Sequence, residues 1–207
     1  MMAKRTKAEA QVTRENILAA AADVFDAKGV AGASLAQIAD QASVTRGAIY
    51  WHFRNKMEIF AALQEQMHQS IIEIVLADLE NDHPRPLQQL QELCVKLLTD
   101  LETDSQKRKT ISIFFLKCDY SGKMEVFLRR QQDNKQKNIE LFERYLDRAK
   151  RKGHLRPEAD SRVLTLSLLF YLTGTVYEYL RGPSLFSLAE VAPALMNQFF
   201  QGITSPS

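Results

Sequence analysis

The sequence of 207 residues predicts an all-α protein. Apolar residues recur every three or four positions along most of the chain, which is the period of an amphipathic helix. Helix-capping residues precede several of these periodic stretches, and the chain contains only 8 glycines. We expect an N-terminal three-helix domain over residues 1–56 and a larger C-terminal helical domain over residues 57–207.

The first helix is expected over residues 13–28, because Ile17, Ala21 and Phe25 recur there at helical spacing. Gly29 follows this stretch, and a glycine readily takes the positive φ that ends a helix. The helix would present one apolar face to the helices that follow it.

Residues 34–56 predict two short helices joined by a tight turn over residues 41–44. Ser34 and Gln37 have the spacing of a capping box, in which each side chain satisfies a backbone donor at the start of a helix. Thr45 can cap the second helix through its hydroxyl group. This pattern is a helix-turn-helix, whose second helix is shaped to enter the major groove of DNA.

The second of these helices carries side chains suited to DNA. The guanidinium of Arg46 can donate to guanine or to phosphate, and Gly47 lets the backbone approach the duplex closely. Tyr50, Trp51 and His52 can pack on sugars and donate to phosphates. The candidate DNA contacts are Ser34, Thr45, Arg46, Gly47, Tyr50, Trp51, His52 and Lys56.

A small helical subdomain whose aromatic residues form its core is the alternative interpretation. Ile49 and Phe53 are four positions apart and fit that core. Three consecutive large residues at 50–52 cannot all face inward on one helix, so at least one of them is expected to be exposed.

The next helix is expected over residues 56–80, with Asn55 and Glu58 capping its start. Lys56 would share one phosphate with free amide groups at this helix N-terminus. The proline-containing stretch at residues 81–86 breaks the helix. Further helices are expected near residues 87–102, 106–118, 122–152, 160–181 and 187–201.

Residues from Thr13 to about Lys56 resemble the DNA-binding domain of the TetR family of bacterial transcriptional repressors. The segment VTRGAIYWHFRNKMEIF is especially similar to the AcrR-like regulators, which repress multidrug efflux pumps. The resemblance implies the fold described above, binding to an operator, and a small-molecule effector site in the C-terminal domain.

Residues 163–180 are apolar on almost every side of the expected helix, and such a helix must be covered all round. In the family that the chain resembles, the last two helices of each subunit pack as a four-helix dimer interface. A twofold dimer would present two reading helices to a palindromic operator. A monomer with one deeply buried central helix is the alternative. Apolar residues of the two helices include Leu166, Leu168, Phe170, Val176, Leu188, Val191, Leu195, Phe199 and Phe200.

The middle of the chain is rich in aromatic residues with a few polar ones among them, as a pocket for an amphipathic molecule requires. Aromatic residues at helical spacing also form ordinary core, so each single assignment has that alternative. The candidate ligand contacts are Gln64, Met67, His68, Ile71, Phe114, Asn138, Phe142, Phe170, Thr173 and Tyr177.

Enzymatic activity is not indicated. The four histidines are scattered, and neither a metal-binding motif nor a phosphate-binding glycine-rich loop is present, so we expect no metal and no cofactor. The first 56 residues hold eight basic and five acidic side chains, a net charge of +3, which leaves the remainder near −1. Positive charge therefore accumulates on the expected DNA-binding domain.

The cysteines and the apolar segments indicate a cytoplasmic protein. Cys94 and Cys118 fall in helical patterns and are expected to be reduced and packed. No apolar stretch follows the basic first residues, so no signal peptide is expected. The uncharged run at residues 163–177 is shorter than the roughly 20 residues that a bilayer requires, and it is expected to be a buried helix.

These features predict a ligand-responsive transcriptional repressor of efflux or detoxification genes. It is expected to bind a palindromic DNA operator as a homodimer and to be released by a hydrophobic or amphipathic small molecule, without a membrane partner. One alternative is an effector-independent DNA-binding regulator, either an activator or an architectural factor. Another is a helical module that binds protein through its N-terminal domain.

Overall fold

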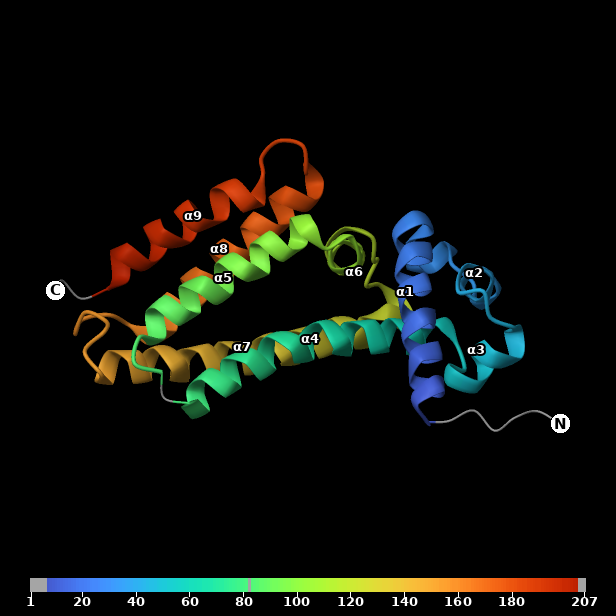
Figure 1. Cartoon of the computed structure of the whole chain (residues 1–207), viewed down its shortest axis with the longest axis horizontal. Coiled ribbons are helices and arrows are strands. Elements are labelled where there is room, and N and C mark those ends of the chain that lie inside the picture. The colour runs from blue at the N-terminus through green and yellow to red at the C-terminus, as the bar shows by residue number, and fades with distance from the viewer. Residues whose placement is uncertain (1–6, 82, 205–207) are drawn as a thin grey trace. The chain divides into compact units, whose positions relative to one another are not determined.

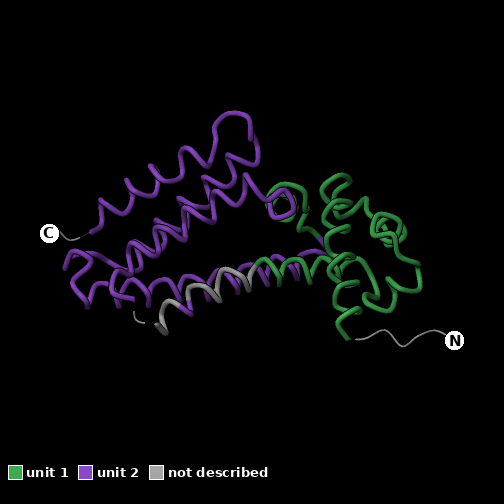
Figure 2. The backbone as a smooth tube through the Cα atoms, viewed as in Figure 1, with its two compact units in different colours: residues 1–68, 109–121 green, residues 69–108, 122–207 purple. Residues whose placement is uncertain are grey.

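A computed structural model describes residues 7–81 and 83–204, apart from the side chains of residues 68–75, 78–81 and 123. The described chain consists of helices α1 to α9 and one 3-10 turn, η1, and contains no strand (Figure 1). The predicted all-α fold is confirmed. The chain divides into two compact units (Figure 2). The functional division at residue 56 stays a prediction.

Unit 1 comprises Met1–His68 and Lys109–Ser121. Its elements are α1 (Lys7–Gly32), α2 (Leu35–Gln41), α3 (Arg46–His52), the first half of α4 (Lys56–Asn81) and most of α6 (Ser105–Leu116). Side chains from each of these helices are fully buried, and each contributes about 1.5–3 kcal/mol through burial. The core includes Ile17, Phe25, Ile38, Ile49, Phe60 and Ile113, all with 0% exposure.

Gly29 has the positive φ that the sequence predicted, 69°, but α1 does not end there. Helical structure resumes after this kink and continues to Gly32. The short stretch beyond the kink leads directly into Ser34, which begins α2.

Unit 2 comprises Gln69–Arg108 and Gly122–Ser207. Its further elements are α5 (Pro86–Thr103), η1 (Gly122–Met124), α7 (Glu125–Arg151), α8 (Ser161–Arg181) and α9 (Leu188–Ile203). Helix α5 packs on α9 and also contacts α8, while α7 packs on α8 (Figure 1). The core includes Leu90, Leu98, Leu146, Leu168, Ala192 and Met196, each exposed by 1% or less.

Helix α8 differs from the expected buried helix. It is long and apolar enough to cross a membrane by length and composition alone, a test that core helices of soluble proteins also pass. Only 17% of its apolar window is buried in the single chain, so the chain by itself covers only part of this helix. Leu168 is on the inner face with 0% exposure, whereas Phe170 is 57% exposed.

Candidate DNA-binding site

The first helix of the motif begins with the predicted capping box. The backbone N–H of Gln37 donates to Ser34 Oγ at 3.3 Å, and the backbone N–H of Ser34 donates to Gln37 Oε1 at 3.1 Å. Ile38 and Ala39 then turn into the core of unit 1. The start and the inner face of α2 are thus confirmed.

The turn between the two helices is closed by local hydrogen bonds. The N–H of Ser43 donates to the carbonyl of Asp40 at 3.1 Å, and the N–H of Val44 donates to that of Ala39 at 3.0 Å. Ser43 takes a φ of 53°, in the left-handed region that lets the chain reverse here. Thr45 Oγ1 accepts from the N–H of Ala48 at 3.1 Å, so it caps α3 as predicted.

Helix α3 has one buried and one exposed face. Ile49 is 0% exposed and Phe53, at its C-terminal cap, is 3% exposed, as the core assignment predicted. Tyr50 and Trp51 are 59% and 73% exposed. Arg46 and Gly47 are also exposed at the start of the helix. Two large aromatic groups therefore face away from the core.

His52 is half-buried and less available than its neighbours. Its ring meets the ring of Trp51 edge-on, with 4.5 Å between the centroids. Arg14 of α1 supports the end of the motif, because its guanidinium carbon lies 5.2 Å from the centroid of the Phe53 ring. No local pattern in the sequence pointed to Arg14, since its partner is far along the chain.

Lys56 begins α4, as the sequence predicted, and it also makes hydrogen bonds that the sequence did not predict. Its Nζ donates to the backbone carbonyls of Ala31 and Ala33 at 2.7 and 2.8 Å, which ties the start of α4 to the link between α1 and α2. Asn55 Oδ1 accepts from the N–H groups of Met57 and Glu58 at the start of α4. The predicted cap by Asn55 is confirmed, and the phosphate contact of Lys56 stays a prediction.

The candidate ligand contacts fall in both units. In unit 1, Gln64 and Phe114 are buried with 1% and 4% exposure, and the Phe114 and Phe60 ring centroids are 4.9 Å apart. Met67 is half-buried. His68 and Ile71 have side chains outside the described part of the structure.

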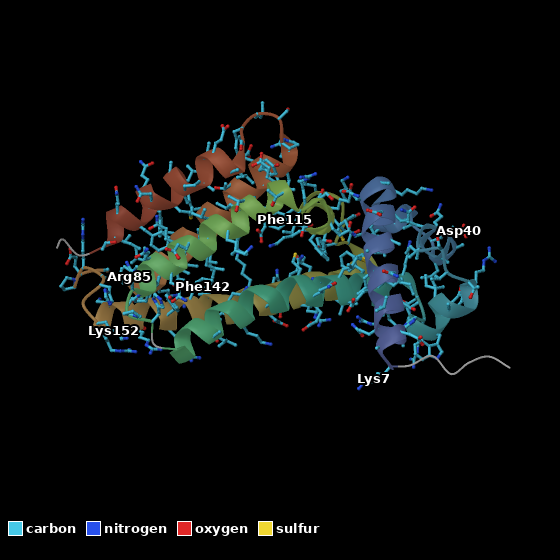
Figure 3. All side chains as sticks on the ribbon, viewed as in Figure 1. Lys7, Asp40, Arg85, Phe115, Phe142 and Lys152 are labelled. Atoms are coloured by element: carbon cyan, nitrogen blue, oxygen red, sulfur yellow. The ribbon has the colours of Figure 1, made fainter. Side chains whose placement is uncertain are left out.

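In unit 2, Phe142 lies inside the helix layers with 4% exposure (Figure 3), and Asn138 is half-buried on the same helix. Phe170, Thr173 and Tyr177 lie instead on the exposed face of α8. This differs from the enclosed position expected for these three, because the inner face of α8 is formed by other residues of the helix.

Two buried hydroxyl groups on that inner face were not identified from the sequence. Thr165 and Ser161 are 0% and 7% exposed, and within the described structure neither Oγ1 of Thr165 nor Oγ of Ser161 has a hydrogen-bond partner. The same holds for Oδ1 of Asn138, on the neighbouring helix α7. Buried polar atoms of this kind are costly unless something satisfies them.

The two cysteines are free thiols. Burial raises the pKa of Cys94 to about 12, so this thiol stays protonated and inert. Burial also raises the pKa of Cys118, against a hydrogen bond with Tyr120 that lowers it, while the charge of Asp119 raises it further. Among the described residues no group of His, Cys, Asp or Glu could hold a metal ion.

Two family profiles cover most of the chain. Residues 17–63 match bacterial regulatory proteins of the tetR family, and residues 85–204 match the C-terminal region of MAATS-type transcriptional repressors. Together with the helix-turn-helix described above, these matches define a DNA-binding transcriptional regulator. The chain belongs to the TetR family, whose members are regulators and not enzymes.

Relatives match the chain over most of its length. It is 34% identical to the transcriptional repressor BepR of Brucella suis biovar 1, over 99% of this chain and 98% of that one. It is 36% identical to the transcriptional regulator TtgR of Pseudomonas putida, over 88% of this chain and 87% of that one.

Solved structures with the same fold include repressors of efflux pumps. A complex of SmeT with triclosan has a TM-score of 0.85 at 30% identity, covering 95% of this chain and 94% of that one. SmeT is the repressor of the multidrug efflux pump SmeDEF of Stenotrophomonas maltophilia. NalD, the secondary repressor of the MexAB-OprM pump in Pseudomonas aeruginosa, has a TM-score of 0.79 at 31% identity, covering 97% of this chain and 100% of that one.

Proposed function

We propose that this chain is a ligand-responsive repressor of efflux or detoxification genes, acting in the cytoplasm as a homodimer on a palindromic operator. The observation that carries the proposal is the exposure of Tyr50 and Trp51 beside Arg46 on α3, a helix whose other face is buried. The relatives that repress multidrug efflux pumps support the choice of genes.

Helix α3 would lie in the major groove, with its exposed face toward the bases. Arg46 would donate to guanine or to a phosphate, and Tyr50 and Trp51 would pack on the sugar-phosphate backbone. The hydroxyl groups of Ser34 and Thr45 accept hydrogen bonds within the motif, and each keeps its own hydrogen to donate to a phosphate.

The dimer would form through the two C-terminal helices, α8 and α9, with the exposed face of α8 supplying apolar side chains. Val163, Phe170 and Tyr177 are 56%, 57% and 39% exposed, and they stand seven residues apart along one side of the helix. Large apolar side chains that recur along one exposed side of a helix are typical of an interaction surface in a soluble protein. A second copy of the chain supplies the same stripe, so a twofold contact would cover both.

The effector site would lie in unit 2, between α7 and α8. Phe142 offers an apolar wall, while Asn138, Ser161 and Thr165 supply buried polar atoms without partners in the described structure. A hydrophobic molecule with a hydroxyl or carbonyl group fits such a site, because few well-placed polar groups orient a ligand in an apolar pocket. Triclosan, bound by SmeT, has this chemical character and serves as a probe.

Release would follow from linkage between the two binding events. An effector that favours the conformation with low affinity for DNA is itself bound more weakly when the operator is present. Moving the protein from 99:1 to 1:99 between two conformations requires about 5.5 kcal/mol of differential binding, which two sites in a dimer would share.

A fluorescence anisotropy titration tests the proposal, with full-length protein and labelled DNA from the region flanking its gene. We expect saturable binding that is specific at a fixed salt concentration and is reversed by triclosan or a related amphipathic compound. Arg46→Ala and Tyr50→Ala should each weaken binding by about 1–3 kcal/mol. Arg129→Ala removes an exposed cation from α7 and should bind like the parent.

Results of the titration that differ from this expectation would each favour a different function. Specific binding that no amphipathic compound reverses would favour the effector-independent regulator. Failure to bind any flanking DNA specifically would contradict the DNA-binding proposal and favour the protein-binding module.

A further inference from the structure

One carboxylate in unit 1 connects three helices. Lys109 Nζ of α6 lies 2.7 Å from Oδ1 of Asp23, which belongs to α1. Nε2 of Gln41 donates to Oδ2 of the same carboxylate at 3.3 Å. Gln41 is the last residue of α2, so the contacts lead from α6 through α1 to the first helix of the helix-turn-helix motif.

Helix α6 is anchored differently at its start. Lys107 Nζ lies 2.8 Å from Oδ2 of Asp100, and Arg108 Nη1 donates to the carbonyl of Glu102 at 2.9 Å, both contacts within unit 2. Of these three consecutive basic residues, Lys107 and Arg108 therefore bond to residues of unit 2, whereas Lys109 bonds to a residue of unit 1. A displacement of the first turn of α6 would be transmitted along the helix to Lys109.

A second ion pair follows the end of α6. Lys117 Nζ lies 2.8 Å from Oδ1 of Asp26 and donates to the backbone carbonyl of Asp26 at 2.7 Å. It holds α6 on α1 one turn from Asp23, and both of these bonds go to α1 rather than to α2. The Lys109 pair, in contrast, involves a carboxylate that also accepts from α2. The Lys117 pair therefore only attaches the end of α6 to α1, whereas the Lys109 pair can also affect the position of α2.

The position of Gln41 matters for α3. It precedes the turn in which the N–H groups of Ser43 and Val44 bond back to carbonyls of α2. Because that turn is short and bonded, a shift at the end of α2 changes the direction in which α3 leaves it. The Asp23 carboxylate is thus placed to influence the position of α3 through Gln41.

We propose that Asp23 is a positioning residue for DNA binding, and that Lys109, Asp23 and Gln41 form a relay from α6 to the reading helix. The inference rests on the DNA-binding function proposed above. Both charged side chains are about one-third exposed, at 38% and 33%, so solvent screens the pair. A pair of moderate strength can break and re-form when α6 moves.

Hydrogen exchange in the full-length, DNA-free protein tests the relay, together with operator affinity measured by anisotropy. We expect Lys109→Met to speed exchange at the amides of residues 38–52 and to weaken operator binding about threefold to tenfold. Lys109→Arg, which keeps the ion pair, should restore both values. Lys117→Met removes the other tie of α6 to α1 and should leave exchange in residues 38–52 close to that of the parent.

The outcomes separate the relay from simpler explanations. Unchanged exchange and affinity in Lys109→Met would overturn the proposal. Equal acceleration throughout unit 1, or an equal effect of Lys117→Met, would assign Lys109 a general stabilising role and also overturn it. If neither the parent nor any variant binds operator but Lys109→Met still speeds exchange in residues 38–52, the structural coupling from α6 to the motif stands, and the proposed DNA-binding function fails.

Discussion

Gly47 occupies an exposed position in α3 at which the chain itself does not need a glycine. A Cβ added there would meet only Thr45 Oγ1, at 3.9 Å, and the residue does not have a positive φ. We expect Gly47→Ala to keep the fold and to stabilise it by up to about 1 kcal/mol, because alanine favours the helix. The same methyl group should weaken operator binding by standing between the α3 backbone and the groove. Denaturant unfolding and anisotropy titration measure the two effects.

A matched control exists in the same unit. Gly32→Ala makes the same chemical change in α1, where an added Cβ would meet Lys28 Cβ at 3.8 Å. We expect this variant to bind operator like the parent. Normal binding by Gly47→Ala would contradict a close approach of α3 to DNA.

The residues predicted correctly are those whose partners are close in sequence. Ser34, Thr45 and Asn55 cap helices within three positions of themselves, so propensity and spacing identify their roles. Lys56 bonds to carbonyls 23 and 25 residues away, which no local pattern reveals. Thr165 was missed for the same reason, because its burial depends on how α8 packs in unit 2.

At the scale of single helices, the exposed stripe of α8 carries the proposal of a dimer. We expect Phe170→Asp to give monomers in sedimentation velocity at concentrations where the parent is dimeric. A carboxylate would have to be desolvated in the interface, which costs several kcal/mol. The single chain should stay folded, because Phe170 is 57% exposed in it.

Val126→Asp provides the comparison for this variant. Val126 is 63% exposed on α7, so the same kind of change occurs on an exposed apolar residue outside the stripe. We expect Val126→Asp to remain dimeric. A dimeric Phe170→Asp protein with unchanged sedimentation would place the interface on another surface.

Most helix ends were predicted to within a few residues, although α1 extends beyond both of its predicted ends, and helix faces were predicted less well. Asp160 and Ser187 cap α8 and α9 by accepting from the N–H groups of Val163 and Glu190, at the starts of the two ranges that the sequence predicted. The start of α9 has a second partner, since Glu102 of α5 accepts from Ser187 Oγ at 3.1 Å. Which face of α8 turns inward depends on its neighbours. An all-apolar sequence does not distinguish Leu168 from Phe170.

At the scale of the whole molecule, we expect a carboxylate paired with two lysines to contribute to stability in acid. Burial raises the pKa of Asp100, but hydrogen bonds from Lys107 and Lys96 and their charges outweigh this and hold the pKa below its ordinary value. Since the folded-state pKa is depressed, the ionised group stabilises the fold above its unfolded-state pKa of about 3.9, and this stabilisation is lost as the pH falls through the folded-state pKa.

We expect Lys107→Met to lower the free energy of unfolding at pH 6. The free energy of unfolding of this variant should approach that of the parent as the pH falls toward 3. Urea unfolding at several pH values measures this difference. Lys137→Met removes an exposed cation from α7 as a control. Its free energy of unfolding should differ from that of the parent by an amount that does not shrink between pH 6 and pH 3. A constant gap between Lys107→Met and the parent would mean that Asp100 does not contribute to acid stability.

An effector that bonds to the buried hydroxyl of Thr165 would change the stability of the whole molecule. A ligand at 100 times its Kd raises the free energy of unfolding by about 2.7 kcal/mol, which appears as a higher Tm. Thr165→Val removes a hydroxyl that has no partner in the described structure, so the ligand-free variant should be as stable as the parent or more stable. We expect the Tm rise caused by triclosan to shrink in this variant, and operator release to require more triclosan.

The two readouts together identify which part of this proposal fails. If triclosan raises the Tm of Thr165→Val as much as that of the parent, the hydroxyl is not the polar anchor, although the protein still responds to a ligand. If triclosan and related amphipathic compounds neither raise the parent's Tm nor release its operator, binding to DNA is independent of such effectors. A smaller Tm rise in a variant whose ligand-free stability is no lower than the parent's would support a direct contact between the ligand and Thr165.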